Sequence, residues 1–330
     1  MTRSSPVNQR RSVSCVSVVN SGTLSPHMRA TAILGLGSFP ESLTPFQSDK
    51  SVEWRLGMPS SREQADVILL FGGDGTVHRH LAQLVRLALP VLIVPAGSGN
   101  DFARALGLRG LRDSRTAWQN FCNGTGNVRE IDLGVISPLQ LAGASPAPHE
   151  PARYFCSVAG LGLDGEVARR ANRLPRWLRG HGGYLLSLAP TIFTYSPLPM
   201  KILTPSENSE AGNHENQSWT TRSDQPTLLA AFANTPLYGG GMKIAPRAKM
   251  DDGLLDVCIV GSVARSRLLR LVPTVYSGGH LNIREVEYFQ SAQVRIETGH
   301  PVDVYADGEF VCRTPVEVAV HRTALKIVTL

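Results

Sequence analysis

Residues 66–77 have the sequence DVILLFGGDGTV. Residues 66–71 are mostly apolar and end in glycines, which is typical of a buried parallel strand. Residues 77–87 then place apolar side chains at helical spacing. A glycine-rich turn between a buried strand and an amphipathic helix predicts one unit of an α/β sheet.

The same pattern extends outward on both sides of this unit. We expect strands at 30–36, 52–56 and 91–94, a brief helix beginning near Ser60 or Ser61, and a helix at 101–106. Residues 28–134 are therefore predicted to form an α/β domain, an open and mostly parallel sheet with helices on both faces. Residues 1–27, rich in Ser, Arg and Asn, are expected to be a disordered extension.

The second half has a different pattern. Residues 137–152 have loop composition, and residues 205–226 are polar enough to be the tip of a mobile hairpin. Strand-like segments follow at 154–158, 199–203, 227–234, 254–260, 293–298, 301–305, 316–320 and 325–328, with helices at 166–172 and 184–193. Residues 135–330 are predicted to form a mostly antiparallel β-sandwich domain, and the last strands are expected to pack back on the first domain.

Composition limits the partners and the compartment. The chain of 330 residues carries a net charge of +6, which favours anionic partners such as nucleotide phosphates or lipid headgroups. Its five cysteines are scattered singly, with no zinc or disulfide spacing, so a cytoplasmic location is expected. No apolar run reaches the length of about 18 residues that a bilayer span requires.

The glycines at 72–75 point to a phosphate-binding turn. Glycine lets the backbone approach a bulky anion, and the amide groups of the turn and of the next helix can bind phosphate oxygens. Asp74 would repel a bare phosphate, and a bound Mg²⁺ would remove that conflict. The alternative is a tight strand-to-helix turn with a capping aspartate.

A second loop of this kind, PAGSGNDFAR at 95–104, follows the strand at 91–94. Gly97 and Gly99 open the loop, Ser98 offers a hydroxyl, and Asn100 or Asp101 is expected to cap the following helix. Both loops lie at the carboxyl ends of strands, which is where ligands bind in open α/β sheets.

Several motifs in one order resemble the diacylglycerol kinase catalytic family, with its sphingosine kinase and bacterial lipid kinase relatives. They are GGDGT at 72–76, PAGSGNDFARALGL at 95–108, FCSVAGLGLDGEVA at 155–168, YGGGMKIAPRAKMDDGLLDVCIV at 238–260 and DGE at 307–309. The resemblance extends from Met28 to the C-terminus. It implies an ATP-dependent lipid kinase that associates peripherally with the membrane.

The resemblance also implies roles for individual residues. Glu309 would be the general base that takes the proton of the lipid hydroxyl, while Asp74 and Asp132 would lie close to catalytic Mg²⁺. A structural Mg²⁺ would be held by the Asp252 carboxylate and the backbone carbonyls of Lys249 and Leu254. The residues implied in ATP binding are Gly72, Gly73, Asp74, Gly75, Thr76, Gly97, Ser98, Asn100 and Asp101.

The sequence departs from the family pattern at two places. The family's Asn-Pro-x-Ser-Gly loop after the first strand is missing, and residues 35–38 (GLGS) are the expected spatial replacement. His78 and Arg79 stand where many relatives have Asn-Glu. Arg79 could pair with nucleotide phosphate, but we favour a solvated helix residue, and we expect His78 and His80 to be surface histidines.

Residues 169–179 interleave five arginines with Leu174, Trp177 and Leu178. This composition suits an anionic membrane surface, although an intramolecular role fits it equally well. With the helix at 184–193, the segment is expected to frame the lipid entrance. No nucleic-acid module is indicated.

Two other functions remain open at this point: a soluble kinase similar to NAD kinase, and a catalytically silent lipid- or nucleotide-binding protein. The sequence leaves the identity of the lipid and the formation of a homodimer open.

Overall fold

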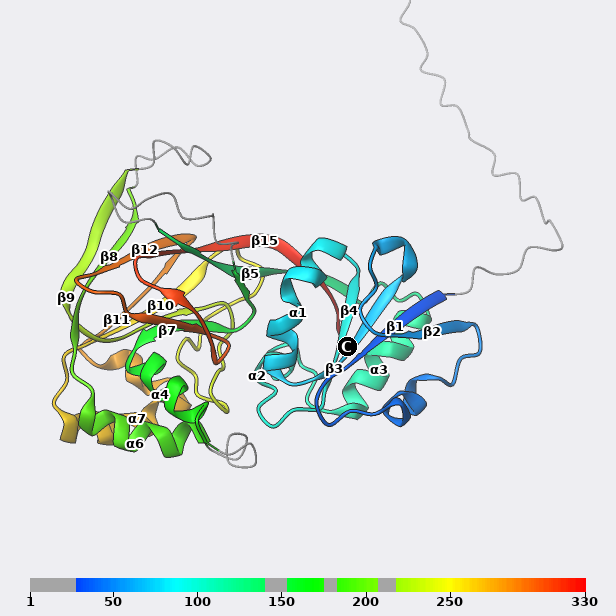
Figure 1. Ribbon diagram of the computed structural model, residues 1–330, viewed down its shortest axis with the longest axis horizontal. Coiled ribbons are helices and arrows are strands. Elements are labelled where there is room, and N and C mark those ends of the chain that lie inside the picture. Colours follow the sequence, from blue (N-terminus) through cyan, green and yellow to red (C-terminus); the bar gives the residue numbers. More distant parts are fainter. Residues whose placement is uncertain (1–27, 140–152, 175–182, 207–217) are drawn as a thin grey trace, which may run out of the picture.

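The computed structural model describes residues 28–139, 153–174, 183–206 and 218–330. The expectations for residues 1–27, for most of the loop at 137–152 and for the tip of the hairpin at 205–226 lie outside these ranges. Two halves lie side by side (Figure 1).

The N-terminal half contains a parallel sheet, as predicted. Its strands, in spatial order, are β2 (Val52–Leu56), β1 (Met28–Leu34), β3 (Val67–Gly72) and β4 (Pro90–Pro95). All residues of β3 are buried, because a central parallel strand is covered on both faces. The carboxyl ends of β3 and β4 therefore lie next to each other, with Gly72 paired to Pro95.

Helices cover both faces of this sheet. α1 (Asp74–Leu87) lies on the side of the C-terminal half, followed by the short α2 (Asp101–Ala105), and α3 (Leu111–Cys122) lies on the other side (Figure 1). Helix α3 was not predicted from the sequence. Its buried Trp118 donates the indole N–H to the carbonyl of Phe46 in η1 (Pro40–Phe46). The brief helix is η2 (Arg62–Gln64), a 3₁₀ turn without a side-chain cap.

The C-terminal half is a β-sandwich-like domain whose strands all pair antiparallel within that half. Its strands are β5 (Val128–Pro138), β6 (Arg153–Phe155), β7 (Val158–Gly162), β8 (Leu198–Pro205), β9 (Trp219–Ala233), β10 (Leu255–Gly261), β11 (Val286–Ser291), β12 (Gln293–Thr298), β13 (Asp303–Ala306), β14 (Glu309–Arg313) and β15 (Val316–Val328). The fold class predicted from the sequence is thus confirmed. One correction concerns β9, which already begins at Trp219, within the stretch expected to be a mobile tip.

Two long strands connect the halves. β15 pairs with β12 in the sandwich and, at Lys326 and Ile327, runs parallel to β4 of the first sheet. The two strands expected at 316–320 and 325–328 are therefore one strand, with an irregular register between His321 and Leu325. β5 pairs with β15 along this whole length, so the expected boundary at 134–135 falls inside β5.

Helices α4 (Leu163–Ala171), α6 (Gly183–Thr194) and α7 (Arg265–Ser277), with η4 (Gly279–Asn282), lie together along one side of the sandwich (Figure 1). Helix α7 was not predicted from the sequence. No residue of this helix is fully buried, and Pro273 interrupts the helical pattern. Within the described residues, no helix combines the length and the apolar character of a membrane span.

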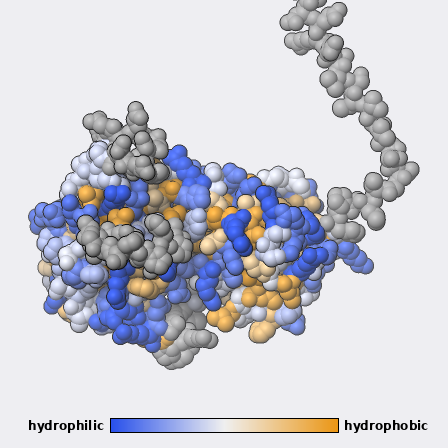
Figure 2. Space-filling model, turned by 45° about the horizontal axis from the view of Figure 1, so that its top comes forward, coloured by the Kyte–Doolittle hydropathy of each residue, from blue (hydrophilic) through white to orange (hydrophobic). Residues whose placement is uncertain are grey.

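Buried side chains gather in three places: around the parallel sheet, inside the sandwich, and between the sandwich and its helices. On the face in Figure 2, hydrophilic residues dominate the C-terminal half, and more apolar residues show on the N-terminal half. The third group also lines a cavity.

Candidate active site

A large cleft of about 770 Å³ opens where the two halves meet. The two glycine loops lie on its N-terminal side, and the 238–240 loop, α4 and the 307–309 turn lie on its C-terminal side. Of the predicted ATP-binding residues, the cleft is lined by Gly73, Asp74, Gly75, Thr76, Gly97, Ser98 and Asp101. Gly72 and Asn100 shape the loops without lining it.

The two glycine loops touch backbone to backbone. A β-carbon added to Gly97 would lie 2.5 Å from the α-carbon of Gly73, which no side chain tolerates. A β-carbon on Gly99 would lie 2.9 Å from Asp74 Oδ2. The glycines are therefore needed for the contact between the loops as well as for access to a ligand.

Asp74 joins the two loops through its carboxylate. Oδ2 accepts the backbone N–H of Asp101 at 3.1 Å, and Oδ1 accepts that of Phe102 at 3.0 Å. Asp74 thus caps α2 from outside, which corrects the expectation that Asn100 or Asp101 would do so. Asn100 adopts the left-handed conformation and bonds back to Gly97 in its own loop.

The cleft carries closely spaced negative charge. Burial raises the pKa of Asp74 above its usual value, and the charges of Asp101 and Asp307 raise it further, although the two backbone N–H bonds oppose the change. Asp101 accepts the backbone N–H of Gly240 at 2.8 Å and pairs with Arg104. These contacts tie the second glycine loop to the C-terminal half.

Glu309 faces the first glycine loop across the cleft. It comes directly after a turn in which Asp307 and Gly308 both have positive φ, as a two-residue hairpin requires. A β-carbon added to Gly75 would lie 3.5 Å from Glu309 Oε1. The structure therefore brings Asp74 and Glu309, which are far apart in sequence, to one cleft.

Asp307 fixes this turn from the other side. Its buried carboxylate accepts the backbone N–H of Ser157 at 2.8 Å and of Cys156 at 2.9 Å. Nδ1 of His78, on α1, lies 3.0 Å from Asp307 Oδ2. The expectation that His78 is a surface residue is wrong, because packing of α1 against the C-terminal half leaves its side chain only 14% exposed.

Asp132 lies outside the residues that line the cleft. The residue is only 3% exposed, and its carboxylate accepts the backbone N–H of Gly253 at 2.7 Å and of Thr323 at 2.8 Å. This geometry joins β5 to the 250–254 turn and to the irregular part of β15. The part of Asp132 in holding Mg²⁺ stays a prediction.

The expected structural metal site, with Lys249, Asp252 and Leu254, lies in the same turn. Asp252 Oδ1 accepts the backbone N–H of Leu254 at 3.1 Å, and the Gln290 amide lies between Asp252 and the buried Asp256. Among the described residues, no group of three or more His, Cys, Asp or Glu side chains could hold a metal. Backbone carbonyls would have to complete this site, which stays a prediction.

The loop after β1 reaches the cleft, since Leu36 of the expected replacement loop lines it. Arg79 lines it too, and its Nε donates to the carbonyl of Gly75 at 3.0 Å. Arg79 is exposed, as expected of a solvated residue, but it stands where an anion in the cleft would meet it.

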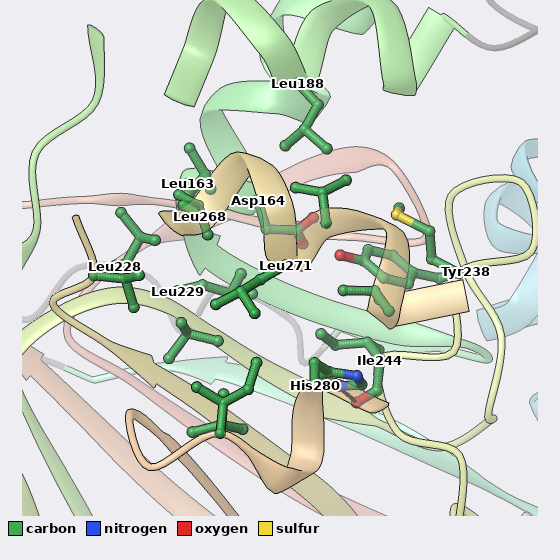
Figure 3. A pocket seen from close by; sticks show the side chains of 17 residues that line it. Leu163, Asp164, Leu188, Leu228, Leu229, Tyr238, Ile244, Leu268, Leu271 and His280 are labelled. Atoms are coloured by element: carbon green, nitrogen blue, oxygen red, sulfur yellow. Dashed lines mark hydrogen bonds between the residues drawn. The ribbon is translucent and has the colours of Figure 1, made fainter. Parts of the chain in front are cut away.

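A second cavity, almost entirely apolar, lies between the sandwich and helices α4, α6 and α7 (Figure 3). Leu163, Leu188, Leu268 and Leu271 contribute to its wall. Asp164 and Tyr238 line both this cavity and the cleft, so the two meet there. Sequence reasoning missed the cavity because α7, which forms one wall, was not predicted.

The arginines of the 169–179 segment are only partly described. Arg169 and Arg170 both pair with Glu166 on α4, which favours the intramolecular role for these two. Arg176, Trp177, Leu178 and Arg179 lie outside the described residues.

Comparison with known proteins agrees with this two-part fold. Residues 52–136 match the diacylglycerol kinase catalytic domain, and residues 157–329 match the YegS C-terminal NAD kinase beta sandwich-like domain. A diacylglycerol kinase of Mycobacterium tuberculosis is 34% identical over 79% of this chain and 76% of its own length. A diacylglycerol kinase of Bacillus subtilis is 25% identical over 74% of this chain and 71% of its own length.

Solved structures show the same fold at low identity. A diacylglycerol kinase from Bacillus anthracis has a TM-score of 0.58 and 17% identity, over 92% of this chain and 97% of that one. An NAD kinase from Archaeoglobus fulgidus in complex with ATP has a TM-score of 0.50 and 13% identity, over 92% of this chain and 94% of that one.

Proposed function

Since this chain belongs to the diacylglycerol kinase family of lipid kinases, we propose that it transfers the γ-phosphoryl group of ATP to the hydroxyl of a diacylglycerol-like membrane lipid. The observation that carries the proposal is the meeting of Asp74, Glu309 and both glycine loops around one cleft. Two phosphate-binding loops opposite a carboxylate suit phosphoryl transfer to an alcohol, which depends mainly on positioning and charge neutralisation.

ATP would bind on the N-terminal side of the cleft. The backbone amides of the glycine loops, the Ser98 hydroxyl and the Arg79 guanidinium are the groups there that suit phosphate oxygens. Asp74 is the carboxylate of the glycine loops that would contact Mg²⁺, and phosphate oxygens of ATP and water would supply the other ligands. Bound Mg²⁺ would neutralise the charge that develops on the transferred phosphoryl group.

Glu309 is the proposed general base. Its carboxylate lies beside Gly75, so an acceptor hydroxyl between them would be near both the base and the phosphate loop. Glu309 would take the hydroxyl proton as the oxygen attacks the γ-phosphorus, and ADP would leave with the electrons of the broken bond.

The apolar cavity is the proposed site for a hydrocarbon chain of the acceptor. It adjoins the cleft at Asp164 and Tyr238, so a chain in the cavity could leave the hydroxyl end of the lipid in the cleft. Its almost entirely apolar wall suits such a chain. Access from a membrane surface would follow from exposed Leu186 and Phe193 on α6, beside this cavity.

A phosphorylation assay on a panel of lipid alcohols in mixed micelles, with labelled ATP and Mg²⁺, tests the proposal. We expect product with diacylglycerol, and with Glu309→Gln a fall in kcat of about a hundredfold or more. Glu297→Gln, at an exposed glutamate on β12, is the matched control and should behave as wild type. Phosphorylation of NAD and of no lipid would instead identify a soluble small-molecule kinase.

A further inference from the structure

His78 is a part of the molecule that the proposed reaction does not use. It stands on α1, one helical turn after Asp74, and it interacts with a residue 229 positions away in sequence. His78 was predicted to be a surface residue, yet its side chain is largely buried against the C-terminal half. A buried imidazole at the edge of a reaction cleft requires an explanation.

The partner of His78 lies two residues before the proposed base. Asp307 has no exposed side-chain surface, and its backbone is in the left-handed conformation. Its carboxylate accepts two backbone N–H groups of the C-terminal half, at Cys156 and Ser157, and Nδ1–H of His78 from the N-terminal half. The Asp307–Gly308 turn is therefore attached to both halves of the molecule through one carboxylate.

This attachment also fixes the start of the next strand. β14 starts at Glu309, whose Oε1 lies against Gly75 at the start of α1. His78 is about one turn further along the same helix. Helix α1 thus contacts this segment twice, through Gly75 at Glu309 and through His78 at Asp307. These two contacts together set the distance between Glu309 and the first glycine loop.

We propose that His78 is a positioning residue, which acts through Asp307 to hold Glu309 at the correct distance from the Gly75 turn. This inference rests on the proposed role of Glu309. The protonated imidazole holds Asp307 by a charge-assisted hydrogen bond, and loss of the proton weakens that bond. Catalysis by the base then depends on the protonation state of His78.

The surroundings of His78 favour the protonated form. Burial by itself lowers the pKa of the imidazole, but the hydrogen bond to Asp307 and the charges of Asp307 and Glu309 outweigh burial and raise the pKa above its usual value. The charge of Arg153 on β6 lowers the pKa of His78 and opposes this change. The charge of Asp307 also raises the pKa of Asp74. The ion pair is therefore expected to persist to a higher pH than an unpaired histidine would allow.

The experiment compares wild type, His78→Ala, His78→Asn and the control His80→Asn. Hydrogen exchange at the backbone of residues 305–310 is measured without substrate, and kcat and the KM for ATP are measured with diacylglycerol micelles between about pH 5.5 and 9. His80 suits the control because it is on the same helix and its Nδ1 lies 3.4 Å from Oε1 of Gln83, within α1 itself.

We expect faster exchange at residues 305–310 in His78→Ala, and a kcat about ten- to a hundredfold lower with little change in the KM for ATP. His78→Asn keeps a hydrogen-bond donor but has no charge, so its kcat should lie between those of His78→Ala and wild type. We expect the kcat of wild type to fall at high pH and the kcat of His78→Asn to show no such fall. His80→Asn should match wild type in all three measurements.

Unchanged exchange at the turn in His78→Ala would overturn the proposal. So would equal losses in His78→Ala and His78→Asn with the wild-type pH profile, since that pattern describes a general loss of stability. A wild type that phosphorylates no lipid would contradict the proposed function, and the exchange comparison alone would then decide whether His78 holds the turn.

Discussion

The carboxylate of Asp74 accepts the backbone N–H of Phe102 at 3.0 Å, so the first glycine loop caps the helix that comes after the second loop. The residue predicted to stand beside the catalytic metal is thus also part of the structure that shapes the site. Substitutions at Asp74 are therefore expected to lower both the stability of the protein and its activity. Two different substitutions can separate these effects.

Asp74→Asn should keep one of the two cap bonds, because an amide has a single oxygen that can accept an N–H, and it removes the charge that Mg²⁺ requires. Asp74→Ala removes both. We expect lipid kinase activity to fall at least about a hundredfold in both variants. Asp74→Ala, which loses both cap bonds, should lose about 0.5–2 kcal/mol of unfolding free energy, more than Asp74→Asn loses. Urea unfolding and the micelle assay measure the two effects, and equal stability of the two variants would contradict the cap.

Gly97→Ala should destabilise the protein by about 1–3 kcal/mol, because the added β-carbon would lie 2.5 Å from the Gly73 backbone and force the loops apart. ATP binding should weaken with it. Gly299→Ala is the control, since a β-carbon there meets no atom within 4 Å. Calorimetric titration with ATP and thermal unfolding check both variants. Wild-type behaviour of Gly97→Ala would mean that the loops are not in contact.

Asp132→Ala should cost about 1–3 kcal/mol of unfolding free energy, because it leaves the N–H groups of buried Gly253 and of Thr323 without the carboxylate that accepts them. Urea unfolding measures the loss. Activity per folded molecule tests the remaining prediction: a large loss in kcat at saturating Mg²⁺ would support a part in metal binding, whereas near-normal kcat would leave Asp132 with its structural contacts alone.

Leu271→Trp should narrow the apolar cavity, of which Leu271 forms part of the wall. We expect a higher KM for long-chain diacylglycerol, and a smaller change for a short-chain analogue that reaches only the cleft. Leu269→Trp is the matched control, because Leu269 is exposed on the same helix and does not line the cavity. Equal effects of Leu271→Trp on both lipids would place the chain elsewhere.

The stability of the protein should depend on pH through His78. Its folded-state pKa is raised above that of the unfolded chain, so its stabilising contribution is fully present below the unfolded pKa of about 6.5. That contribution is lost as pH rises through the folded-state pKa. The difference in Tm between wild type and His78→Asn should therefore shrink as pH rises across this interval. A difference in Tm that grows with pH would mean that folding lowers the pKa of His78 instead of raising it.

Local pattern was sufficient for much of the fold. The buried runs before both glycine loops predicted β3 and β4, and strand-like segments in the second half predicted most strands of the sandwich, although β5, β11 and β14 were missed. α7 was missed because its apolar residues are only partly buried and Pro273 falls inside it. β15 was divided in two because its irregular segment, with Thr323 at positive φ, looks like a break in the sequence.

The sequence by itself determined the chemistry at the strand ends, because glycines and an aspartate between a buried strand and a helix are a local signal. Only the tertiary structure decided which distant groups meet them: Glu309 beside Gly75, His78 on Asp307, and an apolar cavity that joins the cleft at Asp164 and Tyr238. The physical reason is that periodicity reports which face of an element is buried. Which partner covers that face is set by packing across the whole chain.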